Sequence, residues 1–183
     1  MEHATIIGGF GGQGILFAGQ MLAQAALIEG REVSWMPSYG PEMRGGTASC
    51  TVVISDHSIG SPIVDIADSV IALNPPSMAK YERLLAPGGL LVVNGSLIEA
   101  EPDRDDVEVL TVRCTELARA AGHDRLVSVV ALGALLARRP MVAPDSMRQA
   151  LAELVGLHHP ELLEADLAAF TAGYEAAAPA LAR

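Results

Sequence analysis

The sequence predicts an α/β fold: a single doubly wound, mostly parallel sheet with flanking helices and a C-terminal helical layer, Rossmann-like in organisation. Short apolar runs typical of strands alternate with helical stretches up to about residue 112. A glycine-rich turn at residues 8–14 follows the first apolar run and precedes a long uncharged helical stretch. The remaining residues read as consecutive helices. Because no linker, repeat or low-complexity tract interrupts the chain, we expect one domain over residues 1–183.

Each element follows from its local pattern. The first strand ends at Ile6-Ile7, and the helix after it, residues 13–29, stops at Gly30, a residue suited to a helix C-terminus. Residues 37–46 contain too many glycines and prolines for a regular element and are predicted to form a loop. Further strands are expected at residues 31–36, 47–55, 69–73, 90–93 and 107–112. Further helices are expected at residues 77–85, 115–121, 126–137, 144–155 and 160–177.

Composition excludes several classes of function. A net charge of -10 makes the chain a poor candidate for binding nucleic acid or an anionic membrane. Hydrophobic residues make up 50% of the chain, yet no uncharged apolar run approaches the ~20 residues of a membrane span. This apolar excess indicates a deeply buried sheet or a subunit interface. The chain enters its first strand directly after Met1-Glu2-His3, so we expect no signal peptide and a cytoplasmic protein.

The glycine turn matches the pattern G-x-G-x-x-G of dinucleotide-binding folds, with Gly9, Gly11 and Gly14 at its glycine positions and Gly12 and Gln13 between them. A strand, glycine loop and helix in this order aim backbone N–H groups at an anion. A dinucleotide site also needs an acidic residue about 20 positions later, where the sequence has only apolar residues and a serine. No Gly-Lys-Ser/Thr follows, which excludes a P-loop. Two interpretations stay open: an anion or backbone contact at the loop, or glycines that only permit tight packing.

Residues 38–47 form the second unusual stretch. Because they follow the second strand, they should begin at the carboxyl edge of the sheet, near the glycine loop. Arg44 either points toward an anion or a partner, or pairs with Glu42 on an ordinary surface loop. The candidate ligand- or partner-binding residues here are Ser38, Tyr39, Gly40, Glu42, Arg44, Gly45, Gly46 and Thr47.

We predict neither a catalytic residue nor a metal site in this chain. The histidines are isolated or lie at a helix start, and no paired-carboxylate or Gly-x-Ser-x-Gly signature is present. Cys50 and Cys114 lie far apart and cannot frame an iron–sulfur cluster or a zinc site alone. Cys50 falls in a β-branched strand and is expected to be a core thiol.

The glycine loop and residues 38–48, taken together, resemble the gamma subunit of 2-oxoacid:ferredoxin oxidoreductases. The likeness is stronger to the 2-oxoglutarate and branched-chain types than to the indolepyruvate type. Ser128 stands where that family often has Asn, which puts a polar contact at this position in doubt. Further matches are Ile59-Gly60-Ser61-Pro62, Ala67-Asp68, Ala72-Leu73-Asn74, Leu132-Gly133-Ala134 and Ala169-Phe170-Thr171-Ala172-Gly173-Tyr174.

The resemblance implies a complex that oxidatively decarboxylates a 2-oxoacid, with 2-oxoglutarate as first choice, and uses coenzyme A to give acyl-CoA, CO2 and reduced ferredoxin. Thiamine diphosphate, Mg and [4Fe-4S] clusters are then expected on partner subunits: alpha, beta and a ferredoxin-like delta subunit as a further candidate. This chain would pack on the thiamine-bearing subunits and help form the CoA approach. Two alternatives stay open: a free-standing nucleotide- or flavin-binding module, and a purely structural scaffold subunit.

Overall fold

The computed structural model describes residues 1–39, 47–156 and 159–178, which contain one six-stranded sheet. Its spatial order is β2-β3-β1-β4-β5-β6. Of the described strands, only β3 runs against the rest, pairing antiparallel with β1 and β2, while β1–β4, β4–β5 and β5–β6 pair parallel. The predicted, mostly parallel sheet is therefore confirmed. The strands are β1 (Glu2–Phe10), β2 (Glu32–Tyr39), β3 (Thr47–Ser55), β4 (Ala67–Ala72), β5 (Leu85–Asn94) and β6 (Glu108–Val112).

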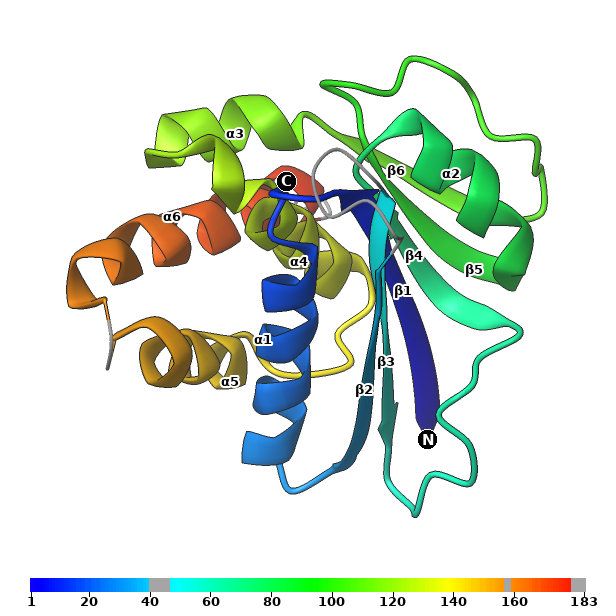
Figure 1. The fold of residues 1–183 in the computed structure, drawn as a ribbon, viewed down its shortest axis with the longest axis horizontal. Coiled ribbons are helices and arrows are strands. Elements are labelled where there is room, and N and C mark those ends of the chain that lie inside the picture. The colour runs from blue at the N-terminus through cyan, green and yellow to red at the C-terminus, as the bar shows by residue number, and fades with distance from the viewer. Residues whose placement is uncertain (40–46, 157–158, 179–183) are drawn as a thin grey trace, which may run out of the picture.

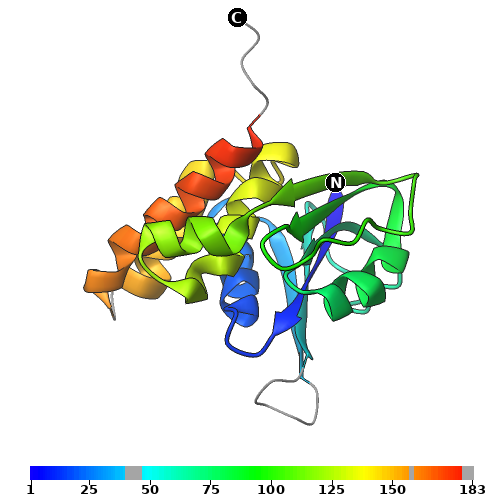
Figure 2. The same cartoon turned by 90° about the horizontal axis from the view of Figure 1, so that it is seen from above.

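Helices cover both faces of this sheet. Figures 1 and 2 show α2 alone on one face and the remaining described helices on the other, where α3 to α6 form the predicted C-terminal layer. In the described part of the chain, no helix combines the length and apolarity that a membrane span requires. The helices are α1 (Ile15–Ile28), α2 (Pro75–Tyr81), α3 (Cys114–Ala121), α4 (Val127–Arg138), α5 (Pro144–Leu151) and α6 (Pro160–Ala177), with short turns at Glu82–Leu84, Asp124–Leu126 and Ala152–Gly156.

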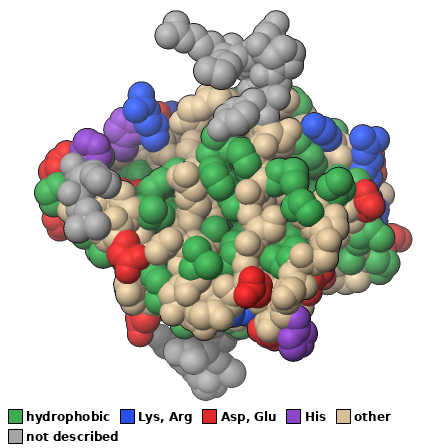
Figure 3. Space-filling view, turned by 60° about the horizontal axis from the view of Figure 1, so that its bottom comes forward, with side chains coloured by type: hydrophobic (Ala, Val, Ile, Leu, Met, Phe, Trp, Pro, Cys, Tyr) green, Lys and Arg blue, Asp and Glu red, His purple; other side chains and the backbone are tan. Residues whose placement is uncertain are grey.

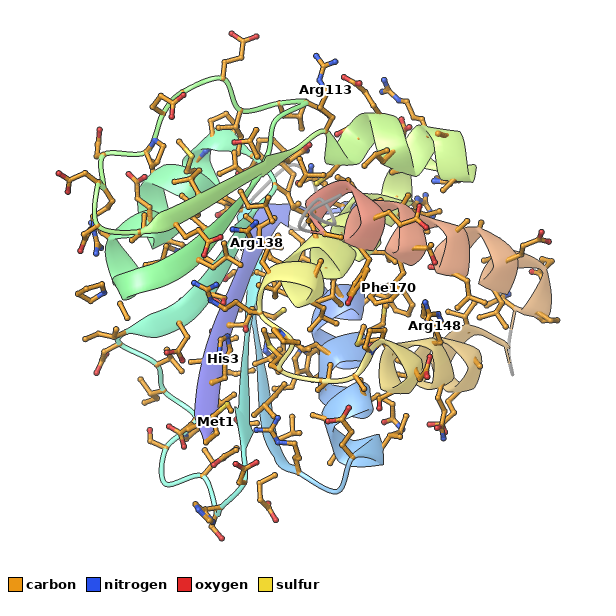
Figure 4. All side chains as sticks on the ribbon, turned by 180° about the vertical axis from the view of Figure 1, so that it is seen from behind. Met1, His3, Arg113, Arg138, Arg148 and Phe170 are labelled. Carbon is orange, nitrogen blue, oxygen red and sulfur yellow. The ribbon has the colours of Figure 1, made fainter. Side chains whose placement is uncertain are left out.

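The larger core lies between the sheet and the multi-helix face. Strand residues such as Ile7 and Val92 pack there with the largest fully buried side chain, Phe170, which stands between α6 and α4 (Figure 4). The smaller core lies under α2, where Met78 and Tyr81 cover the other face of β1, β4 and β5. Burial on both faces explains the long apolar runs of the central strands.

Helices α4 and α6 cross at two glycines. A Cβ added to Gly173 would lie 2.7 Å from the carbonyl carbon of Val130, and one added to Gly133 would lie 2.9 Å from the backbone nitrogen of Tyr174. Both obstacles are backbone atoms of the facing helix, so they cannot rotate away as a side chain could. The crossing therefore requires a residue without a side chain at each position.

Several predicted strand boundaries are wrong. The first strand, expected to end at Ile6-Ile7, runs on to Phe10, because Gly8, Gly9 and Phe10 pair with β3. Residues 37–39, expected to be loop, extend β2, because Pro37 and Tyr39 pair with Cys50 and Ala48 in a hairpin. Proline is tolerated here because β2 is an edge strand. Strand β5 begins at Leu85 rather than at residue 90, through Pro87-Gly88-Gly89, and a register shift between Ala67 and Ser69 on β4 accommodates this entry.

Three predicted helices are too long. The helix expected at residues 13–29 is α1, which spans Ile15–Ile28. The helix expected at residues 77–85 is α2 followed by the 3-10 turn Glu82–Leu84, and the helix expected at residues 144–155 ends at Leu151 before the π-type turn Ala152–Gly156. By contrast, the predicted ranges 47–55 and 160–177 coincide with β3 and α6.

Candidate functional site

The glycine loop is closed by the side chain of Gln13. The backbone N–H of Phe10 donates to Gln13 Oε1 at 2.6 Å, and the backbone N–H of Gln13 donates to the Phe10 carbonyl at 3.2 Å. Gln13 Nε2 also donates to the Leu73 carbonyl at 3.5 Å, which ties the loop to the end of β4. Gln13 therefore holds the loop in shape, and its side-chain amide is engaged inside the protein.

The loop has one packed side and one open side. Gly14, the residue before α1, has φ +75°, and a Cβ there would lie 2.6 Å from Ser128 Oγ and 3.0 Å from the Arg125 carbonyl oxygen. Gly12 also has a positive φ, +95°, but no described atom lies within 4 Å of a Cβ added to it. Gly9 and Gly14 thus permit tight packing, while Gly11 and Gly12 are exposed, and an anion or backbone contact on that open side stays a prediction.

Ser128 does make a polar contact. Its Oγ donates to the Gly14 carbonyl at 3.0 Å, which fastens the start of α4 to the glycine loop. The sequence left a polar contact at this position in doubt, because serine replaces the Asn that is common in the family. The structure shows that Ser128 makes such a contact, with the glycine loop.

Two helix N-termini converge beside the loop. Helix α1 has neither an acidic residue in its first turn nor a side-chain cap, whereas α4 continues the turn Asp124–Leu126, which begins with an acid and is capped by the side chain of His123. Arg125 lies just before α4, is exposed, and forms no ion pair with a described residue. The free N–H groups at the start of α1 and the Arg125 guanidinium favour an anion on the open side of the loop.

The second predicted loop begins where we expected it. Thr47 pairs with Phe10, and Tyr39 pairs with Ala48, so both flanks of this loop lie at the carboxyl edge beside the glycine loop. Ser38 is an exposed residue at the end of β2 rather than a loop residue. The predicted site residues Gly40, Glu42, Arg44, Gly45 and Gly46 lie outside the described residues.

A groove of about 810 Å³ opens next to the glycine loop. Its walls come from four segments that are distant in sequence: the loop itself with the start of α1, the start of β3, the start of α4, and the stretch around the start of α6. Sequence reasoning missed it, because no local pattern shows that these segments converge. One of its lining residues, Asp166, is a buried carboxylic acid on α6.

Burial raises the pKa of Asp166 to about 6, well above its ordinary value of 3.8. The folded state therefore binds the proton more tightly than the unfolded state does. The contribution of Asp166 to the free energy of unfolding is therefore fully present below pH 3.8 and is lost progressively as the pH rises through 6.

The remaining titratable candidates are structural. His3 Nε2 lies 3.0 Å from Ser69 Oγ, and burial lowers the pKa of this histidine, although the Asp68 carboxylate opposes the shift. Figure 4 shows His3 near the amino end of β1, at the edge of the sheet opposite the glycine loop. Cys50 is buried, which confirms the predicted core thiol, and burial raises the pKa of each cysteine thiol to about 12. Within the described ranges, no three His, Cys, Asp or Glu side chains are placed to hold a metal ion.

Comparison with known proteins gives consistent results. The family profile described as "Pyruvate ferredoxin/flavodoxin oxidoreductase" matches residues 4–176. The 2-oxoglutarate synthase subunit KorC of Methanocaldococcus jannaschii is 35% identical over 97% of this chain and 95% of its own length. The ketoisovalerate oxidoreductase subunit VorA of Methanothermobacter thermautotrophicus is 46% identical over 136 residues, and this match spans 28% of VorA.

Solved structures agree with these sequence matches. The gamma subunit of a keto/oxoacid ferredoxin oxidoreductase from Geobacter sulfurreducens superposes with a TM-score of 0.83 and 29% identity, covering 96% of this chain and 98% of that one. A 2-oxoglutarate:ferredoxin oxidoreductase from Magnetococcus marinus, with 2-oxoglutarate, coenzyme A and succinyl-CoA bound, gives a TM-score of 0.86 and 25% identity over 96% of this chain and 31% of that one.

Proposed function

This chain belongs to the pyruvate ferredoxin/flavodoxin oxidoreductase family, and we propose that it forms a single domain that serves as the gamma subunit of a 2-oxoacid:ferredoxin oxidoreductase. The observation that carries the proposal is the end-to-end match to separate subunits of this size, 95% of KorC and 98% of the Geobacter gamma chain. In VorA and in the Magnetococcus chain, the matching region is part of a much longer polypeptide. A subunit that works together with other subunits is consistent with both arrangements, the separate chain and the region of a longer polypeptide.

The proposed complex converts a 2-oxoacid, with 2-oxoglutarate as our first choice, and coenzyme A into acyl-CoA, CO2 and reduced ferredoxin. Thiamine diphosphate with Mg and the [4Fe-4S] clusters are assigned to the alpha, beta and ferredoxin-like delta partners, where they carry the carbon and electron chemistry. Both cysteines of this chain are buried and hold their protons tightly, so they are poor cluster ligands. The isolated chain is expected to be inactive.

We assign the carboxyl edge of the sheet to the CoA approach. The exposed backbone of Gly11 and Gly12, the uncapped start of α1 and Arg125 suit the phosphates of CoA. Arg44, which lies outside the described residues, is our second candidate cation for this contact. The alternative is a scaffold subunit that contacts only other protein chains. Such a subunit would bind no anion at this edge.

Exposed apolar side chains elsewhere form a second candidate surface for partner chains. Figure 3 shows hydrophobic side chains spread over the face at the bottom of Figure 1, with charged side chains mostly near its rim. Large apolar residues that are well exposed include Leu27, Ile63 and Ile66. Exposed apolar surface of this kind is typical of subunits that pack against other chains.

The subunit assignment is tested by omission. The chain is co-expressed with the thiamine-bearing partners, and the reduction of a viologen dye is measured with 2-oxoglutarate and CoA. We expect co-elution on a sizing column and activity only when this chain is present. Full activity without it, together with a monomeric chain that binds no partner, would contradict the proposal.

Replacing Arg44 by alanine tests the CoA contact. We expect the apparent KM for CoA to rise at least about tenfold, since a lost hydrogen bond to a charged group is worth roughly 1.5–3 kcal/mol. The thiamine content of the complex should stay unchanged. The matched control is Arg148→Ala on α5, whose side chain pairs with Asp145 at the surface. An unaltered CoA dependence in Arg44→Ala would instead favour the scaffold alternative.

A ligand screen separates the subunit from a free-standing nucleotide module. The isolated chain is heated with CoA, NAD, FMN or ADP. A ligand present at 100 times its Kd should add about 2.7 kcal/mol to the free energy of unfolding. A strong shift with NAD or FMN alone would contradict the subunit proposal, because neither is a substrate of the proposed complex.

A further inference from the structure

A second, smaller pocket of about 360 Å³ also lies beside the glycine loop. The loop contributes Gly11, Gly12 and Gln13 to its lining. Another part of the lining comes from the ends of β5 and β6, with Leu97 after β5 and Thr115 in the first turn of α3. The volume is that of a small-molecule site. Two distant parts of the chain must keep a fixed separation to form it.

The charged side chains of this pocket leave one positive charge uncompensated. Arg119 and Asp124 both line it, and their charges cancel because Arg119 Nε lies 2.8 Å from Asp124 Oδ1. Arg125 lines it too and forms no ion pair with any described residue. The pocket is therefore compatible with the phosphate contact assigned to CoA at this edge.

One buried side chain, Asn94 at the end of β5, connects the two parts of the lining. Its Nδ2 donates to the Leu73 carbonyl at 3.3 Å and to Thr115 Oγ1 at 3.1 Å. The Leu73 carbonyl also accepts from Gln13 Nε2 at 3.5 Å, and the Leu73 N–H donates to the Gly8 carbonyl at 2.9 Å. Asn94 thus reaches α3 directly and the glycine loop through the end of β4.

The carboxamide of Asn94 is fully engaged. Both hydrogens of Nδ2 have acceptors, and Oδ1 accepts the Ser96 N–H at 3.3 Å. Ser96 Oγ in turn accepts the Thr115 N–H at 3.2 Å, so the start of α3 is held at two points. Asn94 is 0% exposed, and a buried network with every member satisfied is rigid.

We propose that Asn94 is a positioning residue for CoA: it sets the separation between the glycine loop and the start of α3. This inference rests on the proposed function, which supplies CoA. Asn94 does not itself line the pocket, so it acts through Leu73 and Thr115. The competing explanation is that Asn94 only stabilises the ends of β4 and β5.

The test uses Asn94→Asp in the assembled complex, because aspartate keeps the shape and the Oδ1 acceptor but removes both donors. We expect the apparent KM for CoA to rise about fivefold, as for the loss of one ordinary hydrogen bond. The kcat and the KM for 2-oxoglutarate should stay within about twofold of the parent, because the positioned contact binds substrate and transition state alike. A merely structural role would lower the thermal midpoint and leave the KM for CoA unchanged.

The matched control is Asn74→Asp. Asn74 ends the neighbouring strand β4, is also 0% exposed, and caps α2 by accepting the Ser77 N–H at 2.9 Å. Aspartate can accept the same bond, so this control adds a buried charge near the same edge without releasing α3 or the glycine loop. We expect its KM for CoA to equal that of the parent.

Thr115→Val is the second variant, in case Asn94→Asp fails to fold. It keeps the shape of the side chain and removes the hydroxyl that accepts from Asn94. We expect a rise of about fivefold in the KM for CoA, which Thr115→Ser should reverse because serine keeps the hydroxyl. The double variant should have no higher KM than Asn94→Asp alone, since both substitutions break the same bond.

An unchanged KM for CoA in Asn94→Asp or in Thr115→Val would overturn the inference. An equal rise in Asn74→Asp would also overturn it, because the effect would then come from the added charge. A double variant whose KM rises by the product of the two single effects would overturn it as well, since Thr115 would then act independently of Asn94. If the parent complex shows no dependence on CoA, the proposed function fails instead.

Discussion

Replacing Gly173 by alanine is expected to lower the free energy of unfolding by about 3 kcal/mol, at the upper end of the usual cost of overpacking. The added Cβ would overlap the backbone carbonyl of Val130, the residue of α4 that faces it. Since α4 and α6 enclose Phe170 and Leu132 of the larger core, separating the helices to make room would also open that core. Gly133→Ala places a methyl group against the backbone of α6 at the same crossing and should cost a similar amount.

Urea unfolding of the purified chain measures this loss, and Gly60→Ala provides the matched control. No described atom lies within 4 Å of a Cβ added to Gly60, so that change should stay within about 0.5 kcal/mol of the parent. Alanine also has the higher helix propensity, which favours the variants at positions 133 and 173 by up to about 1 kcal/mol. A net stabilisation at either position would therefore show that the helices are not in close contact at these glycines.

The sequence predicted those parts of the fold that local patterns determine. The β-branched run at residues 47–55 predicted the bounds of β3. Pro160, which precedes a helical pattern of apolar residues, predicted the start of α6. The end of β2 was missed because its pairing with β3 overrides the local preference of Pro37. The edge position that permits this proline is a property of the whole sheet. It cannot be predicted from the sequence of a single segment.

The candidate site was predicted only where the chain order itself brings residues together. Strand β1 and its following helix are adjacent in sequence, so the glycine loop could be located, and the strand order then placed Thr47 beside it. The role of Gln13 as a clamp on Phe10 was not predicted, since a glutamine in a glycine loop carries no distinctive signal. Asp166 was missed for a different reason. An acid in a helix is normally exposed, and only the tertiary packing of α6 against other parts of the fold buries this one.

Two glycines of the loop, replaced one at a time, should separate packing from function. Gly14→Ala is expected to lower the free energy of unfolding by about 2–3 kcal/mol, because backbone strain at a positive φ adds to the contact with the Arg125 carbonyl. Gly12→Ala meets no described atom, so only the strain of φ +95° remains, and the loss should be about 1 kcal/mol. Urea unfolding of the two variants, side by side, measures the difference.

The same pair is expected to behave in the opposite order in the assembled complex. Gly12 lies on the open side of the loop, where a methyl group would obstruct the close approach of a phosphate or a partner backbone. We therefore expect Gly12→Ala to raise the apparent KM for CoA, or to weaken assembly, by more than its small stability loss explains. Gly14→Ala, with its methyl group directed at Ser128, should mainly affect the thermal midpoint. If both variants change stability and CoA dependence in parallel, the open side of the loop has no contact role, and the glycines serve packing alone.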